Sequence, residues 1–381
     1  MKLLYIANQR LPTEKAYGVQ IAKMCEAFAS ERLDVKLAYP FRDNHIEDDL
    51  ISYYSVKSSF KVKRIWAPDF YFPGRLDKIA VNIKEVISAL LLCFYALTCE
   101  VDIIYSRDEW PLYFLSFFKK NLFFEAHKFS DARKLFYKRF KKVGIKTIVI
   151  SGGLKDDFLK FGFTSDSLLL APDGVDLEEF NIDISKKEAR VRMDLPLDRK
   201  IVMYTGHLFE WKGADILLQA AKTYNLQPTT YNPLFVFVGG MPADIENFRK
   251  KAEKLMLNNV LILGHKPHKE IPFFLKAADI LVLPNSAKEE ISRSYTSPLK
   301  LFEYMAVNRP IVASNLPSIQ EVLDHDNSIL VKSDSPEDLV NGIEIILNKP
   351  DASSVIAQKA LEDVKNYTWQ KRAESILKFI G

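Results

Sequence analysis

Short runs rich in β-branched and aromatic residues alternate with helix-like stretches along the whole of this 381-residue chain. In the first half, the strand-like runs occupy residues 3–7, 35–39, 101–105, 121–125 and 147–151. In the second half, they occupy residues 201–206, 234–240, 260–264, 279–284, 310–314 and 328–331. Strands that alternate with helices pair in parallel, because each helix carries the chain back to the starting edge of the sheet. The pattern therefore predicts an α/β protein with two doubly wound parallel sheets.

The length of the chain suits two domains, and a turn-forming Pro-Asp-Gly run that begins at Pro172 marks the boundary. We predict an N-terminal domain over residues 1–170 and a C-terminal domain over residues 171–366. Residues 367–381 form an amphipathic pattern with no strand after it, and we expect this final helix to pack back on the first domain. Ligands of doubly wound sheets bind beyond the carboxyl ends of the strands. Two such domains facing across a cleft would line it with the loops that follow their strands.

The charge balance excludes some classes of partner. The chain has 53 basic and 49 acidic residues, a net charge of +4, which is too balanced to indicate nucleic-acid binding. Residues 1–170 hold 27 of the basic and 20 of the acidic residues, so this half could meet an anionic surface. The three cysteines lack metal-ligand spacing and indicate a reducing compartment. We expect a cytoplasmic protein, with or without peripheral attachment to the inner face of the cell membrane.

Two segments bear on membrane contact. Residues 86–97, "VISALLLCFYAL", are too few to span a bilayer and fit a buried helix or a helix that dips into a membrane. Residues 132–146, "ARKLFYKRFKKVGIK", place seven basic side chains among Leu135, Phe136, Phe140 and Val143. The basic residues are Arg133, Lys134, Lys138, Arg139, Lys141, Lys142 and Lys146. This pattern fits either a helix that binds an anionic membrane or a solvated basic helix.

Two loops of the first half could carry chemistry. Gly18 ends the long loop after the first strand and begins a helix, where it would let a ligand approach the backbone amides or would simply form a turn. His127 follows an apolar strand in "FFEAHKFS". It would hydrogen-bond a sugar hydroxyl or stabilise charge, or it has a structural role. No GxGxxG follows a strand, so a dinucleotide site has no support.

The second half has two lysines where a helix dipole disfavours cations. In "YTGHLFEWKGADILL" a strand leads to Gly206 and His207, and Lys212 precedes the next helix. In "SYTSPLKLFEYMAVNRPIVAS" we expect Ser297 to cap a helix that begins at Pro298, with Lys300 in its first turn. Cations there are favourable if an anion lies against the helix start.

Glu303, one turn after Lys300, presents two acceptor oxygens that suit the two hydroxyls of a ribose. Lys300 and Glu303 are the polar pair in an otherwise apolar stretch. The two lysine-bearing helix starts therefore predict a site for a diphosphate, and Glu303 predicts a nucleoside attached to it. Solvent-facing side chains on an ordinary helix are the alternative.

A metal site and a resident cofactor have little support in the sequence. The Asp-His-Asp run that begins at Asp324 lies in a turn and fits a solvated loop. There is no HExxH or Cys/His cluster and no GxSxG motif. We expect no metal in the chemical step and no cofactor, since the lysines could hold the diphosphate that a divalent ion holds elsewhere.

The chain resembles the retaining nucleotide-sugar glycosyltransferases of family 4, which have the GT-B fold of two Rossmann-like domains. The stretches that carry the resemblance are "PDGVDLEEF", "GHLFEWKGADILLQAA", "FVFVGG", "HKEIPFFLKAADILVLP", "SPLKLFEYMAVNRPIVASNLPSIQEVL" and "YTWQKRAESILKFI". The resemblance implies that the C-terminal domain holds the nucleotide sugar and that a final helix crosses back.

The resemblance also implies roles for individual residues. Lys212 matches the phosphate-binding lysine of the family, and Glu303 matches the ribose-binding glutamate. Ser297, Pro298, Leu299 and Lys300 match the segment whose amides lie over the diphosphate. Gly18 matches the glycine of the N-terminal loop, and Gly206 with His207 lies in the donor-binding loop. His127 resembles the histidine near the sugar, so His127, Lys212 and Glu303 are the expected catalytic residues.

Two positions depart from the family pattern. Tyr295 stands where the first glutamate of a pair would face the sugar, and His207 stands where an arginine would bind phosphate. Phosphate binding then depends more on Lys212 and Lys300.

The sequence thus predicts a glycosyltransferase that moves a sugar from a nucleoside-diphosphate donor to a hydroxyl of a glycan or lipid-linked acceptor, with retention, in cell-surface glycan or glycolipid synthesis. A nucleotide-sugar epimerase of the same fold and an inactive nucleotide-sugar-binding subunit remain alternatives.

Overall fold

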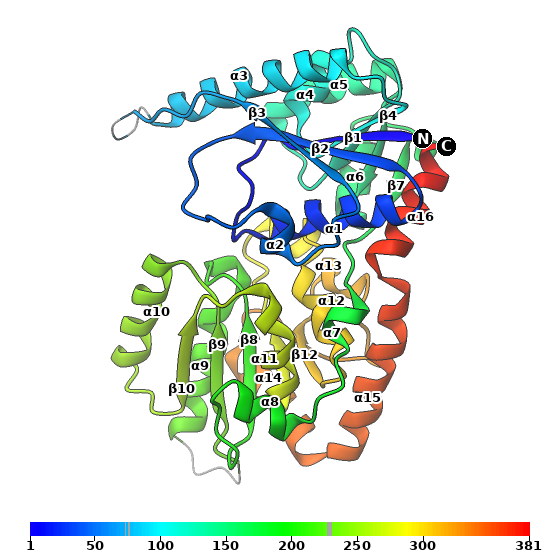
Figure 1. Cartoon of the computed structure of the whole chain (residues 1–381). Helices are drawn as coiled ribbons and strands as arrows, with labels where there is room; N and C mark the ends of the chain where they lie inside the picture. The colour runs from blue at the N-terminus through cyan, green and yellow to red at the C-terminus, as the bar shows by residue number, and fades with distance from the viewer. Residues whose placement is uncertain (73, 75–76, 227–230) are drawn as a thin grey trace. The chain divides into compact units, whose positions relative to one another are not determined.

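The computed structural model describes residues 1–72, 74, 77–226 and 231–381. Contacts divide the chain into two units, which Figure 1 shows with their helices and strands labelled. Unit 1 contains residues 1–172 and 369–381, and unit 2 contains residues 173–368. Both divisions fall two residues after the boundaries expected from the sequence.

Unit 1 is built on a seven-stranded parallel sheet with the order β3-β2-β1-β4-β5-β6-β7. Its strands are β1 (Lys2–Ile6), β2 (Asp34–Phe41), β3 (Lys61–Trp66), β4 (Ile103–Ser106), β5 (Leu122–Ala126), β6 (Lys146–Val149) and β7 (Leu168–Leu170). Its α-helices are α1 (Ala16–Ser30), α2 (Leu50–Tyr54), α3 (Asp77–Thr98), α4 (Glu109–Leu115), α5 (Lys134–Val143), α6 (Gly152–Lys160) and α16 (Trp369–Ile380). Short 3₁₀ turns cover Asp131–Arg133 and Ser165–Ser167. Figure 1 shows α3, α4 and α5 over one face of the sheet and α1 with α16 over the other.

The two strands that the sequence pattern did not predict, β3 and β7, are the edges of this sheet. β3 reads Lys-Val-Lys-Arg-Ile-Trp and exposes most of its side chains, so it has no apolar run to identify it. A charged edge strand of this kind resists pairing with another chain. β7 has only three residues and ends just before Pro172, where the sequence placed the domain boundary. The exposure of β3 and the short length of β7 therefore explain why these two edge strands lack a clear sequence signal.

Helix α3 is longer and more exposed than the buried helix that the 86–97 run suggested. It has 22 residues, and among the described helices it alone is long and apolar enough to cross a membrane by length and composition. Only 39% of its most apolar window is buried, and Phe94 is 71% exposed. One side of α3 packs on the sheet through residues such as Leu92 and Ala96, while the other side is apolar and exposed.

Unit 2 contains a six-stranded parallel sheet with the order β10-β9-β8-β11-β12-β13. The strands are β8 (Ile201–Thr205), β9 (Leu234–Val238), β10 (Val260–Gly264), β11 (Ile280–Leu283), β12 (Ile311–Ser314) and β13 (Ile329–Val331). The α-helices are α7 (Leu177–Phe180), α8 (Lys186–Arg192), α9 (Ala214–Leu226), α10 (Pro242–Lys254), α11 (Ile271–Ala277), α12 (Leu299–Ala306), α13 (Pro317–Gln320), α14 (Pro336–Asn348) and α15 (Pro350–Asp363). Short turns are η4 (Glu210–Lys212), η5 (His268–Glu270), the π-helical η6 (Ile291–Tyr295) and η7 (Val364–Asn366).

Both faces of the unit 2 sheet are buried, which explains the continuous apolar runs of its strands. Along β8, Met203 packs in a core with Leu281 and Ala306 on one side of the sheet. Val202 and Tyr204 point to the opposite side and pack in a second core. Alternate residues of one strand therefore enter two cores, as a parallel sheet covered by helices requires.

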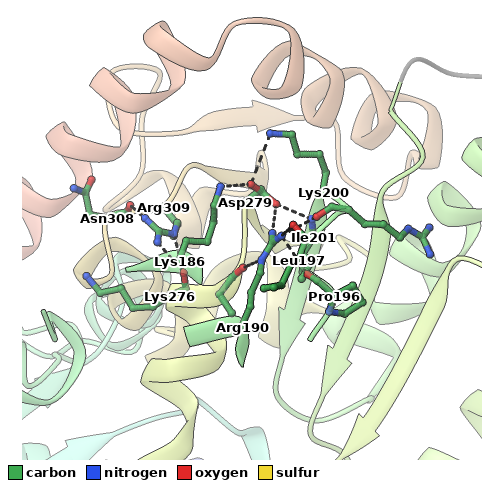
Figure 2. Close-up of polar contacts among 12 residues, drawn as sticks. Lys186, Arg190, Pro196, Leu197, Lys200, Ile201, Lys276, Asp279, Asn308 and Arg309 are labelled. Atoms are coloured by element: carbon green, nitrogen blue, oxygen red, sulfur yellow. Dashed lines mark hydrogen bonds and ion pairs between the residues drawn. The ribbon is translucent and has the colours of Figure 1, made fainter. Parts of the chain in front are cut away.

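Figure 2 shows an ion cluster around Asp279 at the amino ends of the central strands of unit 2. Asp279 directly precedes β11 and accepts hydrogen bonds from Lys186 Nζ at 2.5 Å, Arg190 Nη2 at 2.5 Å and the amide of Ile201 at 2.8 Å. Arg190, only 4% exposed, also donates to the backbone carbonyls of Ala277 and Arg199. Because ligands of such sheets bind at the carboxyl ends of the strands, we assign this cluster to fold stability.

Candidate functional site

Lys300 is the most unusual charged side chain of unit 2. It lies in the first turn of α12, is 7% exposed, and its Nζ has no hydrogen-bond partner among the described residues. The Nζ atom lies 3.9 Å from the centre of the Tyr204 ring, a cation–π contact. Burial and then the charge of Lys212 lower the pKa of Lys300 well below its ordinary value, against the attraction of Glu303. A buried ammonium with an unfilled donor shell is suited to receive an anion.

Lys212 ends the η4 turn in the loop after β8. The side chain is half-buried, its Nζ lies 4.9 Å from the Trp211 ring centre, and burial lowers its pKa to about 8 although Glu303 acts in the opposite direction. Gly213 follows with φ +74°, and a Cβ there would lie 1.7 Å from the carbonyl oxygen of Pro284. Glycine is therefore required at this point, and its contact with the carboxyl end of β11 holds the Lys212 loop in place.

The charge of Glu303 acts on both lysines. Glu303 also lies near His268, a histidine that was not expected from the sequence to belong to the site. His268 Nδ1 lies 2.9 Å from Glu179 Oε1, and His268 Nε2 lies 3.6 Å from Glu303 Oε1, which is an ion-pair distance longer than a hydrogen bond. Although burial favours the neutral imidazole, the hydrogen bonds and charges of Glu179 and Glu303 raise the pKa of His268 to about 10. His268 is thus an imidazolium that pairs with Glu179 and lies at ion-pair distance from Glu303.

The Gly206–His207 segment forms the turn at the carboxyl end of β8. Gly206 has φ +120° and donates its amide to the carbonyl of Val238 at 2.8 Å. The ring of His207 stacks on Phe209 with 4.9 Å between ring centres. Tyr204 Oη donates to the carbonyl of His207 at 2.5 Å. These contacts give the segment a fixed backbone next to Lys300, whose Cδ atom would lie 3.9 Å from a Cβ on Gly206.

The start of α12 differs in one detail from the expected cap. The first helical residue is Leu299, Pro298 is in the capping position, and no side chain caps the helix. Ser297 was predicted to be the cap, but Pro298 occupies that position with an extended ψ of 123°. Ser297 Oγ instead accepts the amide of Asp173 at 2.9 Å. Without a side-chain cap, the first amides of α12, including those of Leu299 and Lys300, have no acceptor within the helix.

In unit 1, His127 follows β5 and belongs to a buried network centred on Glu125. Glu125 is fully buried and accepts from His127 Nε2 at 2.6 Å, from Arg372 Nη1 at 3.2 Å and from the hydroxyl of Tyr105. Burial and then the charge of Arg107 lower the pKa of His127 to about 4, against the effect of Glu125. The imidazole is therefore neutral near pH 7, and with Nε2 donating to Glu125, Nδ1 is left as an acceptor.

Gly18 lies in the first turn of α1, where the structure assigns it a packing function. A Cβ at this position would lie 1.9 Å from Tyr54 Oη and 2.8 Å from Thr13 Cγ2. The Gly18 amide already donates to the carbonyl of Lys15 at 2.9 Å. The absence of a side chain at Gly18 is thus explained by Tyr54, whose hydroxyl binds the backbone of Thr13.

A cavity of about 540 Å³ opens in unit 1 at the carboxyl ends of β1, β2, β4 and β5, and His127 lines it. Within the described ranges, no group of three or more His, Cys, Asp or Glu side chains could hold a metal ion. The sequence expectation that the chemical step needs no metal remains a prediction.

Comparisons with solved structures define the class of fold. A crystal structure of Anabaena Alr3699/HepE in complex with UDP and glucose aligns with 99% of this chain and 98% of its own, with a TM-score of 0.75 and 18% identity. The structure of WaaG, a glycosyltransferase involved in lipopolysaccharide biosynthesis, aligns over 99% of each chain, with a TM-score of 0.71 and 14% identity. The fold is therefore GT-B, as predicted from the sequence.

Sequence comparisons point to a family. Residues 185–363 match the family model described as glycosyl transferases group 1. The D-inositol 3-phosphate glycosyltransferase of Corynebacterium urealyticum is 27% identical over 213 residues, which cover 54% of this chain and 48% of that protein. The putative teichuronic acid biosynthesis glycosyltransferase TuaC of Bacillus subtilis is 28% identical over 211 residues, which cover 54% and 49%. The chain spans about half the length of the curated relatives it matches. Together these findings support the group 1 glycosyltransferases as the family, with the match carried by unit 2.

Proposed function

We propose that this protein is a retaining glycosyltransferase of family 4, which transfers a sugar from a nucleoside-diphosphate donor to a hydroxyl of a glycan or lipid-linked acceptor in the synthesis of cell-surface glycans or glycolipids. The observation that carries the proposal is the buried Nζ of Lys300, which has no hydrogen-bond partner among the described residues and lies near a second cation, Lys212, and the carboxylate of Glu303. Two cations without a second anion are unfavourable in a buried site, and a diphosphate removes that cost.

The proposed roles follow from the chemistry of each group. Lys300, Lys212 and the first amides of α12 bind the diphosphate and stabilise the negative charge that develops on it as the glycosidic bond breaks. Glu303, which lies beside the imidazolium of His268, accepts the ribose hydroxyls. The neutral His127 accepts a hydroxyl of the transferring sugar at Nδ1. The acceptor hydroxyl attacks from the face that the diphosphate leaves, which gives retention.

The names of the similar proteins support transfer rather than epimerisation, since both curated relatives are named as glycosyltransferases and the HepE complex contains UDP and glucose. Tyr295, in place of a glutamate, favours the second candidate, an inactive nucleotide-sugar-binding subunit. Slow hydrolysis of the donor by the purified protein would separate an enzyme from a binding subunit.

The test is a screen of nucleoside diphosphates and nucleotide sugars by thermal shift, followed by product analysis. A ligand at about 100 times its dissociation constant stabilises the protein by about 2.7 kcal/mol. The anomeric configuration of the product, measured by NMR, decides retention. A protein that binds no nucleoside diphosphate would disprove the proposal. A complete, metal-reversible loss of turnover in excess chelator would contradict the expected independence of metal.

We also propose that the protein is cytoplasmic and that unit 1 docks peripherally on an anionic membrane. The prediction that the apolar side of α5 makes this contact is partly wrong, because Phe136 and Phe140 are buried in the core. The exposed apolar side chains lie instead mainly on α3 and after α4. The surface consists of Ile79, Ile83, Leu90, Phe94 and Leu97 of α3, Phe117 and Phe118 after α4, and Leu135 and Val143 of α5. Helix α4 packs against both α3 and α5, so these side chains belong to one part of unit 1.

The exposed lysines Lys120, Lys138 and Lys142 supply positive charge near this α3–α5 surface. Vesicle flotation with and without anionic lipid tests the docking. Phe94→Gln should weaken binding at every salt concentration, whereas Lys138→Gln should weaken it only at low salt. Lys250→Gln, at an exposed site in unit 2, is the matched control. Equal binding to neutral and anionic vesicles would refute the electrostatic contribution.

A further inference from the structure

The unit 1 cavity is lined by basic side chains from four neighbouring strand ends. Arg10 follows β1, Arg42 follows β2, Arg107 follows β4 and Lys128 follows β5. Because these strands are parallel neighbours in the sheet, their following loops meet at one edge. The topology thus gathers four cations from widely separated parts of the sequence around one cavity.

These four cations form no ion pair with the described carboxylates of the cavity, although the charges of Arg107 and Lys128 act on Asp108. Asp69 is paired with Lys84 at 3.2 Å, and Glu85 lies 3.7 Å from Arg133. A third carboxylate, Asp108, accepts the amide of Asn8 at 2.6 Å. In the described part of the chain, none of the four strand-end cations has a carboxylate within ion-pair distance.

Three buried polar atoms of cavity-lining residues have no hydrogen-bond partner in the described structure: Arg42 Nε, Asn8 Oδ1 and Gln9 Oε1. Arg42 holds its orientation by donating from Nη2 to Ser88 Oγ at 2.9 Å, which leaves the Nε–H as an unfilled charged donor. The two amide oxygens are unfilled acceptors, which suit hydroxyl donors. A ligand that carries both an anionic group and hydroxyls would satisfy all three atoms.

We propose that this cavity binds the glycosyl acceptor through an anionic group, a phosphate or a carboxylate, held by Arg42, Arg107 and Lys128. The inference rests on the proposed glycosyltransferase function and adds the chemical class of its acceptor. Asn8 and Gln9 accept hydroxyls of the same ligand. The neutral His127 lines the same cavity, so the acceptor and the residue proposed to contact the transferring sugar share one site.

Two tryptophans allow both proposed sites to be observed in one experiment. Trp110 lines the unit 1 cavity, and Trp211 contacts Lys212 in unit 2. The full-length protein is labelled with 5-fluorotryptophan, and Trp110→Phe and Trp211→Phe assign the two ¹⁹F signals. Glucose 6-phosphate, glucuronate and glucose are the probes for the cavity, and nucleoside diphosphates are the probes for unit 2.

We expect glucose 6-phosphate, glucuronate or both to shift the Trp110 signal, and glucose to leave it in place at the same concentration. The charged sugar that binds more tightly identifies the anionic group. Arg42→Gln and Lys128→Gln should each weaken this response by about 10-fold or more. Lys128 is exposed, so its substitution tests the proposal even if Arg42→Gln disturbs packing. Lys63→Gln, at an exposed site on β3, is the matched control.

Equal effects of glucose and the charged sugars, no response of Trp110 to any of them, or unchanged binding by both variants would overturn the proposal. Failure of the proposed transferase function has a different signature. In that case no nucleoside diphosphate moves the Trp211 signal, whatever happens at Trp110.

Discussion

Lys300→Met is expected to raise the stability of the free protein and to weaken its binding of nucleoside diphosphate. Methionine keeps most of the apolar stem of the side chain and removes the ammonium. An unsatisfied buried polar group costs about 1–3 kcal/mol, and more when it is charged. The cation–π contact with Tyr204 offsets roughly 0.5–2 kcal/mol of this destabilisation. The free protein should therefore become more stable by about 1 kcal/mol, which corresponds to a rise in Tm of roughly 2–4 °C for a domain of this size.

Binding should change in the opposite direction. A charge-assisted hydrogen bond contributes about 1.5–3 kcal/mol, so loss of Lys300 should weaken nucleoside-diphosphate binding by roughly 10- to 150-fold. Nucleoside binding should be spared, because Lys300 is proposed to contact only the diphosphate. Glu303→Gln should weaken nucleoside and nucleoside diphosphate alike, since its proposed partner is the ribose.

The assay is titration calorimetry with both ligands, combined with thermal unfolding of the free protein. Lys250→Met, at an exposed site in the same unit, is the matched control and should alter neither binding nor stability. If Lys300→Met binds nucleoside diphosphate like the wild type, the diphosphate is not held by Lys300. If the variant is strongly destabilised, the buried ammonium has a structural function and the reasoning from its unfilled donors is wrong.

Four further outcomes are expected. The pKa of Lys212 is about 8 in the free protein, so the affinity for diphosphate should fall as the pH rises from about 7 to about 9. Calorimetry in buffers of different ionisation enthalpy should show proton uptake near pH 8, and Lys212→Met should abolish this uptake. His268 has a pKa of about 10, above its ordinary value, so the contribution of His268 to the stability of the fold is complete below about pH 6.5 and is lost as the pH rises to about 10. The difference in the free energy of urea unfolding between wild type and His268→Gln should therefore disappear over that range. His127→Ala should lower kcat more than donor affinity, by the same factor from about pH 6 to about pH 8, because His127 with a pKa of about 4 stays neutral throughout; a factor that changes near pH 6.5 would indicate a charged histidine. Asp279→Asn should destabilise the protein by about 3 kcal/mol in urea unfolding, because it leaves the buried Arg190 without its carboxylate, whereas Asp198→Asn, at an exposed site, should have little effect.

Much of the fold could be predicted because its signal is local. All eleven strand-like runs correspond to strands. Most of these strands are buried on both faces and must be apolar throughout, and the half-buried edge strands β10 and β13 are apolar as well. Strands β3 and β7 were missed because β3 is mostly exposed and rich in charged residues, and because β7 has only three residues. The length of α3 was underestimated because its first residues, 77–85, include charged side chains and therefore lie outside the apolar run. The motif "HKEIPFFLKA" contains His268 and was noted for its resemblance, yet nothing in its spacing shows that a histidine there would meet two glutamates.

The sequence by itself determined the alternation that gives two parallel sheets, and it placed Lys212 and Lys300 at helix starts where a chain without an anionic ligand has little reason to put them. The tertiary structure decided how deeply Lys300 is buried, that His268 bridges Glu179 and Glu303, and that His127 is neutral. The physical reason is that protonation and ion pairing depend on distances through space and on the exclusion of water. Glu125 and Arg372, for example, are 247 residues apart in the chain and 3.2 Å apart in the fold, a proximity that no local pattern encodes.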